Sequence, residues 1–308
     1  MSQILNMTQK YFLLLLVALL FFSACQQQSA ATQEEKVEPT ITDYERIISL
    51  SGAITETLFA LGHGDKVIGI DVTSTYPPEE VSQRTQLGHV RNLNVEGVLS
   101  LEPDLILVDK KDAGNPAIQQ LRQSEIAVLV VPVNYTLEAP VEIATTIAAK
   151  LGGHAEVQAL QEKVESAKAQ LSAITADRKN PKVLFIYARG AGSMMVAGKN
   201  TSADAMIQLA GGVNAVTEFE GFKALSAEAL ILAQPDVLLL FESGLQSVGG
   251  MEKLLEMPGI EQTTAGKHQQ VIAMDGLYLL GFTPRVGEAA IELAEELQAI
   301  AEKQTDNS

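Results

Sequence analysis

The residues of this chain that could do chemistry are few and far apart. Cys25 is the only cysteine, so one chain can form neither a disulfide nor a cluster of thiolate metal ligands. The four histidines, His63, His89, His154 and His268, are scattered, and nothing in their spacing predicts a shared metal site. The sequence contains no Gly-x-Ser-x-Gly, Walker or His-Glu-x-x-His motif. We therefore expect a protein that is not an enzyme.

Cys25 follows a segment with the features of a secretory signal. Lys10 is the only charged side chain before the apolar run at residues 11–22, and Ser23 and Ala24 follow it. A run of about 12 residues is too short to cross a bilayer as a helix, which needs about 20. The small residues before the cysteine resemble a bacterial lipobox, although position 22 is phenylalanine where leucine is usual. The sequence predicts a signal peptide over residues 1–24 and a lipid anchor on Cys25.

The segment after the cysteine predicts a tether. Residues 25–43 are rich in Gln, Ala, Thr and Glu and show no apolar periodicity, which is typical of a flexible linker. Removal of the signal removes one lysine, so the net charge changes from −16 to −17 whether translation begins at Met1 or at Met7. Such a charge argues against nucleic acid and against electrostatic binding to anionic lipid. We expect an exported lipoprotein, periplasmic or at the cell surface, that is held to the membrane by its lipid alone.

The chain contains an internal repeat, which predicts its architecture. Residues 97–108 and 229–240 each read as a short helix, a Pro-Asp pair and a continuous apolar run. Such a run is typical of a strand that is buried on both faces of a parallel sheet. Two copies of the same unit indicate two similar lobes.

Each copy is preceded by a strand and a capped helix. Residues 47–50 predict a strand and residues 55–62 a helix that ends at a glycine, and residues 183–187 and 201–211 repeat this pattern. Strand–helix alternation with short connections is typical of a doubly wound sheet. The roughly 265 residues after the tether exceed the usual size of a single core. We therefore expect an α/β fold with two doubly wound, Rossmann-like lobes.

A segment rich in Ala, Glu and Lys lies between the two copies. Gly152 and Gly153 break it, which leaves a second helix near residues 155–176 that would span about 33 Å. Its position favours a rigid helix that connects the lobes over an ordinary surface helix, and Pro181 would end it. The predicted boundaries are an N-terminal lobe at 44–138, connecting helices at 139–180 and a C-terminal lobe at 181–308.

Short motifs in both lobes resemble substrate-binding proteins for ABC importers of vitamin B12, siderophores and haem. In the first lobe they lie at residues 46–50, 55–56, 61–62, 76–78 and 97–104. In the second lobe the resemblance is to the haem-transport branch, at residues 197–198, 201–206, 209–212, 219–226 and 277–282. The resemblance covers residues 44–300 and implies a ligand between two lobes that move little about a hinge.

The resemblance also implies an iron ligand. Proteins of the haem branch commonly ligate iron through a tyrosine in a Gly-Tyr-x-Arg segment, and residues 88–91 here read Gly-His-Val-Arg. Imidazole binds haem iron well, so the replacement is chemically competent. His89 follows a short segment, residues 84–87, and precedes a helix that Asn94 could cap, which predicts a loop at the cleft. We expect His89 to be the axial ligand and Arg91 to contact a haem propionate.

The expected partners from the second lobe rest on weaker signals. Arg189 follows the first strand of that lobe and, with Lys223, is a candidate for a propionate. Tyr187 or Met194 could approach the distal face of the iron, although core filling is the plainer interpretation of the methionine and solvent exposure that of the lysine. Some members of the family hold a second haem on a histidine near here, and the lack of one in this sequence favours a single haem.

Carboxylates of the two lobes are expected to contact arginines of the permease. Glu79 and Glu80 in the first lobe and Glu252 in the second are candidates, although with 38 carboxylates in the chain a solvated surface residue is the plainer interpretation of any one of them. The resulting hypothesis is a monomer that binds haem as transported ligand and delivers it to an ABC transporter permease, with no nucleic-acid partner. A corrinoid or ferric siderophore is an alternative ligand. An exported enzyme on the same scaffold is a second alternative, and it would need a catalytic cluster.

Overall fold

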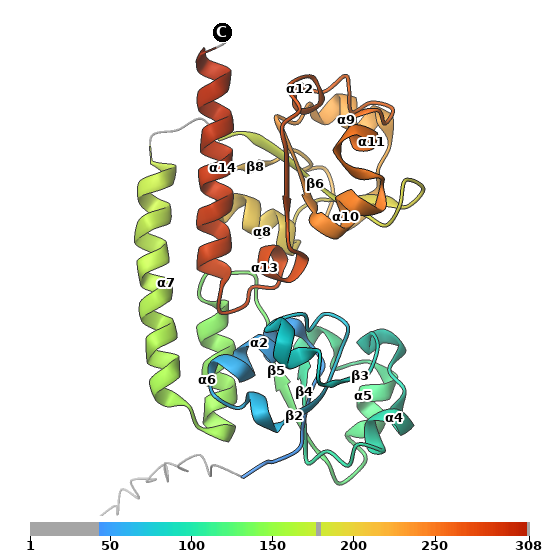
Figure 1. The fold of residues 1–308 in the computed structure, drawn as a ribbon, viewed down its shortest axis with the longest axis vertical. Coiled ribbons are helices and arrows are strands. Elements are labelled where there is room, and N and C mark those ends of the chain that lie inside the picture. Colours follow the sequence, from blue (N-terminus) through green and yellow to red (C-terminus); the bar gives the residue numbers. More distant parts are fainter. Residues whose placement is uncertain (1–42, 177–179, 307–308) are drawn as a thin grey trace, which may run out of the picture. The chain divides into compact units, whose positions relative to one another are not determined.

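The computed structural model describes residues 43–176 and 180–306, whose fold is shown in Figure 1. The predicted signal peptide, Cys25 and nearly all of the predicted tether lie outside these residues. Within the described part of the chain, no helix combines the length and the apolar character needed to span a membrane. The fold is α/β, with two doubly wound lobes and a long helix that joins them, which confirms the predicted class.

The N-terminal lobe contains a parallel five-stranded sheet of order β3-β2-β1-β4-β5. Successive residues of its central strands face opposite cores: Ile47 and Leu105 belong to one, Ile48 and Ile106 to the other. Because helices cover both faces, these strands are apolar throughout, as the repeat predicted. The strands are β1 (Ile47–Ser49), β2 (Val67–Ile70), β3 (Thr85–Gln86), β4 (Leu105–Asp109) and β5 (Ala127–Val131), and the helices are α2 (Gly52–Ala60), α3 (Pro78–Val81), α4 (Val95–Leu99) and α5 (Pro116–Leu121).

The C-terminal lobe contains a six-stranded sheet with β11-β10-β6-β7-β9 in order and β8 paired to β6. Strands β6, β10 and β11 are parallel, and helices again cover both faces. The strands are β6 (Lys182–Ala188), β7 (Met194–Ala197), β8 (Val213–Asn214), β9 (Phe222–Ala224), β10 (Val237–Phe241) and β11 (Val271–Met274), and the helices are α8 (Ser202–Leu209), α9 (Ala227–Ala233), α10 (Glu242–Ser247), α11 (Gly250–Leu255), α12 (Thr264–Lys267), α13 (Gly276–Leu280) and α14 (Val286–Asp306).

One edge of this second sheet differs from the parallel pattern that the sequence predicted. Strand β7 is antiparallel to β6, and β9 is antiparallel to β7. The cause is a tight hairpin: Gly190 has a φ of +80°, Ser193 N donates to its carbonyl at 3.1 Å, and Arg189 N donates to Ser193 O at 2.9 Å. The second sheet is therefore mixed, and its hairpin carries several of the predicted site residues.

The Pro-Asp pairs of the repeat have the same structural role in both lobes. The Asp104 carboxylate accepts from Arg46 N at 3.1 Å, just before β1, and the Asp236 carboxylate accepts from Lys182 N at 2.9 Å, at the start of β6. Each aspartate also donates its own N–H to the carbonyl of that same neighbour. The repeated dipeptide therefore sets where the central strand of each lobe begins.

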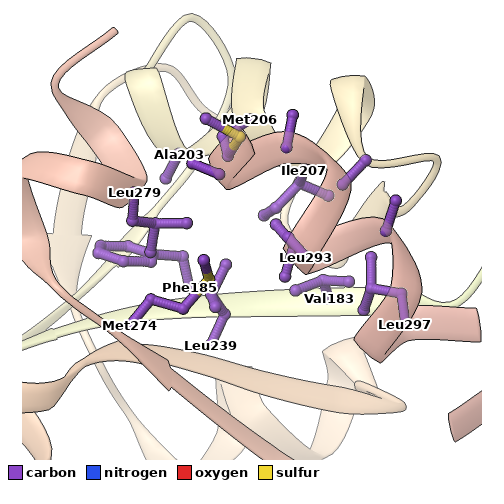
Figure 2. Packing of buried hydrophobic residues seen from close by; sticks show 14 of the residues in the cluster. Val183, Phe185, Ala203, Met206, Ile207, Leu239, Met274, Leu279, Leu293 and Leu297 are labelled. Carbon is purple, nitrogen blue, oxygen red and sulfur yellow. The ribbon is translucent and has the colours of Figure 1, made fainter. Parts of the chain in front are cut away.

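The larger core of the C-terminal lobe lies where β6 and β10 meet α8 and α14, as Figure 2 shows. Phe185 and Leu239 project from the strands, whereas Met206 and Leu293 come from the helices, and all four are fully buried. The apolar faces of α8 and α14 bury enough surface against the sheet to stabilise the lobe by several kcal/mol, at about 1.5–3 kcal/mol for each fully buried large side chain.

Two helices, α6 (Ala139–Leu151) and α7 (His154–Thr175), connect the lobes. The break between them falls at Gly152 and Gly153, whose φ angles of +88° and +100° favour glycine. Leu160 of α7 packs in the N-terminal core and Val164 in the C-terminal core, so this helix is shared by both lobes. It runs beside α14 in Figure 1, and the close approach depends on Gly287, where a Cβ would lie 2.5 Å from Ala167 Cβ.

Candidate ligand-binding site

The predicted ligand His89 lies in a loop at the carboxyl end of the N-terminal sheet. It follows β3, as expected for a binding loop of a parallel sheet. The loops after β2 and β3 are joined, because Val72 N donates to Gly88 O at 3.1 Å. These two loops, with the one after β4, bring together the polar groups of the N-terminal half of the site.

His89 is half-buried, and its ring already makes a local hydrogen bond. Its Nδ1 accepts from Arg91 N at 3.1 Å and begins the short 3₁₀ helix Val90–Asn92. An accepting Nδ1 carries no proton, so a neutral ring in this geometry has its hydrogen on Nε2. Ligation of a metal through Nε2 requires that proton to move to Nδ1 and the bond to Arg91 N to break.

Next to His89 lies a buried polar network that the sequence analysis missed. The Asp71 carboxylate accepts from Thr73 Oγ1 at 2.8 Å and from Ser74 Oγ at 2.9 Å, and Thr55 Oγ1 lies 2.7 Å from Ser74 Oγ. Burial raises the pKa of Asp71 above its ordinary value, while the hydrogen bonds from Thr73 and Ser74 and the nearby His89 oppose the shift. The network holds the loop after β2 against α2.

Charged groups at the end of β4 and just after it belong to the N-terminal half of the candidate site. Lys111 Nζ lies 2.7 Å from Asp109 Oδ2, and that carboxylate is almost fully buried. Burial raises the pKa of Asp112, and neighbouring Lys111, Arg91 and His89 act against the rise. The predicted propionate ligand Arg91 is exposed, so its guanidinium is accessible to a ligand carboxylate.

The C-terminal half contains aromatic rings and two cations. Tyr187 of β6 contacts the rings of Phe222 and Phe241 edge-on, with centroids 6.4 and 5.9 Å apart. The guanidinium of Arg189 lies 5.2 Å from the Tyr187 ring, whereas Lys223 Nζ lies 4.5 Å from the ring of Phe219 instead. The structure therefore groups Tyr187 with Arg189 and places Lys223 on β9, which is separated from β6 by β7.

The remaining predicted residues lie elsewhere on these elements. Met194 is half-buried on β7 and packs against an apolar core, in line with the core-filling interpretation. Glu79 and Glu80 are exposed in the first turn of α3, and Glu252 is exposed in the first turn of α11.

Exposed apolar side chains lie in loops that follow strands of the N-terminal lobe and at the start of β9, and the sequence analysis did not identify them. Tyr76 follows β2, Tyr135 follows β5 and Phe222 begins β9, and they are 37%, 39% and 43% exposed. Val72, in the loop joined to Gly88, is 50% exposed. The rule that sites follow strand ends would have found Tyr76 and Tyr135, because both come a few residues after an apolar run.

Comparisons with known proteins agree on one family. The family model described as "Periplasmic binding protein" matches residues 47–278. The uncharacterized ABC transporter substrate-binding lipoprotein YvrC of Bacillus subtilis is 30% identical over 261 residues, which cover 82% of this chain and 80% of that protein. The vitamin B12-binding protein of Vibrio cholerae is 28% identical over 264 residues, covering 84% and 91%.

The chain is also similar to a solved structure, and that protein is named for heme rather than for vitamin B12. The periplasmic heme-binding protein RhuT from Roseiflexus sp. RS-1, in apo form, is 41% identical, with a TM-score of 0.79, and covers 84% of this chain and 100% of that one. The chain belongs to the periplasmic binding protein family and is a substrate-binding protein of an ABC transporter, which binds its substrate without catalysis.

Proposed function

We propose that this protein binds haem between its two lobes, with His89 as axial ligand of the iron, and delivers it to an ABC transporter permease. The observation that carries this proposal is a single half-buried imidazole, His89, in a loop at the carboxyl end of the N-terminal sheet, with the exposed cation Arg91 two residues on. Among the described residues, no three His, Cys, Asp or Glu side chains are arranged to hold a bare metal ion. One imidazole suits an iron that a porphyrin already holds by four nitrogens.

The other features of haem also have matching groups. The porphyrin is flat and apolar, and Tyr76, Tyr135 and Phe222 offer exposed aromatic surface of the kind that such a ligand buries. Its propionates are carboxylates, for which the guanidinium groups of Arg91 and Arg189 are suited.

Further contacts of the transport cycle belong to the same proposal. Lys223 is a second propionate contact of the C-terminal lobe, and Tyr187 or Met194 is the distal neighbour of the iron. Cys25 carries the lipid that holds the protein near its permease, and Glu79, Glu80 and Glu252 dock to that permease. The similarity to the lipoprotein YvrC of Bacillus subtilis supports the anchor.

A corrinoid is the second candidate ligand. The relative from Vibrio cholerae is named a vitamin B12-binding protein, and the cobalt of a corrinoid also accepts an imidazole ligand. The haem assignment is favoured because the similar protein named for heme shares 41% of aligned residues, against 28% for the relative named for vitamin B12.

The test is a visible absorption titration of the full-length protein with ferric haem. We expect a saturable shift of the Soret band in the wild type and in His268→Ala, which removes an exposed histidine at the end of α12. His89→Ala should lose the shift or weaken binding at least about tenfold, which corresponds to roughly 1.4 kcal/mol. No shift in the wild type would refute haem as ligand, and an unchanged shift in His89→Ala would refute His89 as the ligating residue.

A further inference from the structure

One stretch of the C-terminal lobe contacts the N-terminal lobe at several points. This inter-lobe segment, residues 277–285, contains most of α13 and ends just before α14. Residues 277–282 of this segment form one of the motifs that resemble the haem-transport branch. The contacts of the segment involve α2 and the loops after β2 and β5 of the N-terminal lobe.

The strongest contact is an ion pair between Arg285 and Glu56 of α2. Arg285 Nε donates to Glu56 Oε1 at 2.8 Å and Nη2 donates to Oε2 at 2.9 Å, so both carboxylate oxygens are used. The Glu56 side chain is 4% exposed and that of Arg285 is 21% exposed. A two-point contact of this kind fixes orientation as well as distance, and partial burial reduces its screening by salt.

Two tyrosines, one from each lobe, contact the same guanidinium. Its Cζ lies 3.6 Å from the ring centroid of Tyr76, which belongs to the N-terminal lobe, and 5.0 Å from that of Tyr278 in α13. A planar guanidinium stacks well on aromatic faces, because the negative face of the ring attracts the cation. Arg285 is therefore held by an anion and two rings rather than by one flexible contact.

The rest of the inter-lobe segment is packed tightly on the same lobe. At Gly52 of α2 a Cβ would lie 2.6 Å from Leu277 Cδ1, so the glycine permits α13 to approach. The ring of Phe282 lies 5.4 Å from that of Tyr135. The fully buried Thr283 accepts from Arg285 N at 3.2 Å, which ties the arginine to the start of α14.

We propose that Arg285 is a positioning residue that holds the two lobes at a fixed separation, so that one ligand contacts both without closure of a hinge. Lobes joined only by small polar contacts are expected to move relative to each other. Here a two-point ion pair between two rings restrains that motion near the strand ends. The inference rests on the proposed function only in placing a ligand between the lobes, whatever the ligand is.

The experiment uses the absence of tryptophan from the chain. Tyr135→Trp places one fluorescent reporter against Phe282 in the full-length protein, and acrylamide quenching without ligand measures its exposure. In this background we compare Arg285→Gln and Arg285→Lys with Lys253→Gln, which removes a cation from an exposed ion pair within the C-terminal lobe. The quenching constant should rise about twofold in Arg285→Gln, rise less in Arg285→Lys, and stay unchanged in Lys253→Gln, because of these two cations Arg285 pairs across the lobes and Lys253 pairs within one lobe.

Arg285→Lys is included because Arg285→Gln could fail to fold. Loss of the cation leaves the Glu56 carboxylate buried and unpaired, which can unfold the protein. Lysine keeps the charge and removes the two-point contact and the stacking. Circular dichroism checks that each variant is folded. If Arg285→Gln is unfolded, the quenching constant of Arg285→Lys is the one that tests the proposal. Unchanged quenching in folded Arg285→Lys contradicts the proposal.

A second readout separates this inference from the identity of the ligand. With haem bound to the chain with native Tyr135, Arg285→Lys should release haem about tenfold faster while the Soret maximum stays where it is in the wild type. If haem does not bind at all, the proposed function fails, but the quenching experiment still tests the inter-lobe contact. Unchanged release from a protein that does bind haem also contradicts the positioning role.

Discussion

At the scale of single residues, the site is built from side chains that already have partners. His89 accepts from Arg91 N, Lys111 pairs with Asp109, and Asp71 accepts from two hydroxyls. Ligation of the proposed haem iron by His89 would therefore exchange one hydrogen bond for a metal–nitrogen bond, with a change of tautomer. The buried network around Asp71 holds the loop after β2, and that loop is joined to the His89 loop by the hydrogen bond from Val72 N to Gly88 O.

Arg91 allows the propionate contact to be tested separately from the iron ligand. Arg91→Gln should weaken haem binding about two- to fivefold, the effect expected for an exposed ion pair, and should leave the Soret maximum unchanged. Arg122→Gln is the matched control, because Arg122 is an exposed arginine of the same lobe at the end of α5. Equal affinities for Arg91→Gln and the control would show that Arg91 makes no contact with the ligand.

At the scale of elements, small residues decide how closely the parts approach. Gly52 begins α2, and a Cβ there would lie 2.4 Å from Thr73 O in addition to its clash with Leu277. At Gly97, in α4, a Cβ would make only an ordinary van der Waals contact, 3.6 Å from Asn94 Cγ. The two glycines thus differ in packing, although both are helical.

This difference predicts opposite effects of the same substitution. Gly52→Ala should lower the free energy of unfolding by about 1–3 kcal/mol, because the added methyl overpacks a fixed backbone contact. Gly97→Ala should leave it unchanged or raise it by up to about 1 kcal/mol, because alanine is the better helix former. Urea unfolding of both variants measures the two values, and an undiminished stability of Gly52→Ala would show that the contact is not tight.

The elements were also the part that the sequence predicted best. The apolar runs and glycine stops gave the central strands, α2, α8 and the long α7, because these signals are local and periodic. The antiparallel β7 and β9 were missed, because a hairpin of short strands carries no long apolar run. The pairing of Glu56 with Arg285, 229 residues apart, has no local signal at all.

At the scale of the whole molecule, the two lobes and the predicted lipid anchor serve one task. A substrate-binding protein works by presenting its ligand to a permease, so it must both hold the ligand and remain near the membrane. The acidic chain, with a net charge of −16, is repelled by anionic lipid. The lipid on Cys25, which lies outside the described residues, is therefore the expected attachment.

Replacement of that residue tests the anchor. Cys25→Ser should move the protein from the membrane fraction to the soluble fraction of a bacterial host, because no other segment after the signal is predicted to hold it there. Haem binding by the soluble variant should equal that of the wild type, which shows that it is folded. Retention of Cys25→Ser in washed membranes, with wild-type haem binding, would contradict anchoring by this cysteine.

The proposed ligand is bound between the two lobes, so its identity is tested on the whole molecule. The most direct measurement is a pair of calorimetric titrations of the full-length protein, one with ferric haem and one with cyanocobalamin, in the same buffer. We predict that haem binds at least about 100-fold more tightly, a difference of roughly 2.7 kcal/mol. Cyanocobalamin binding as tightly as haem, or more tightly, would contradict the account.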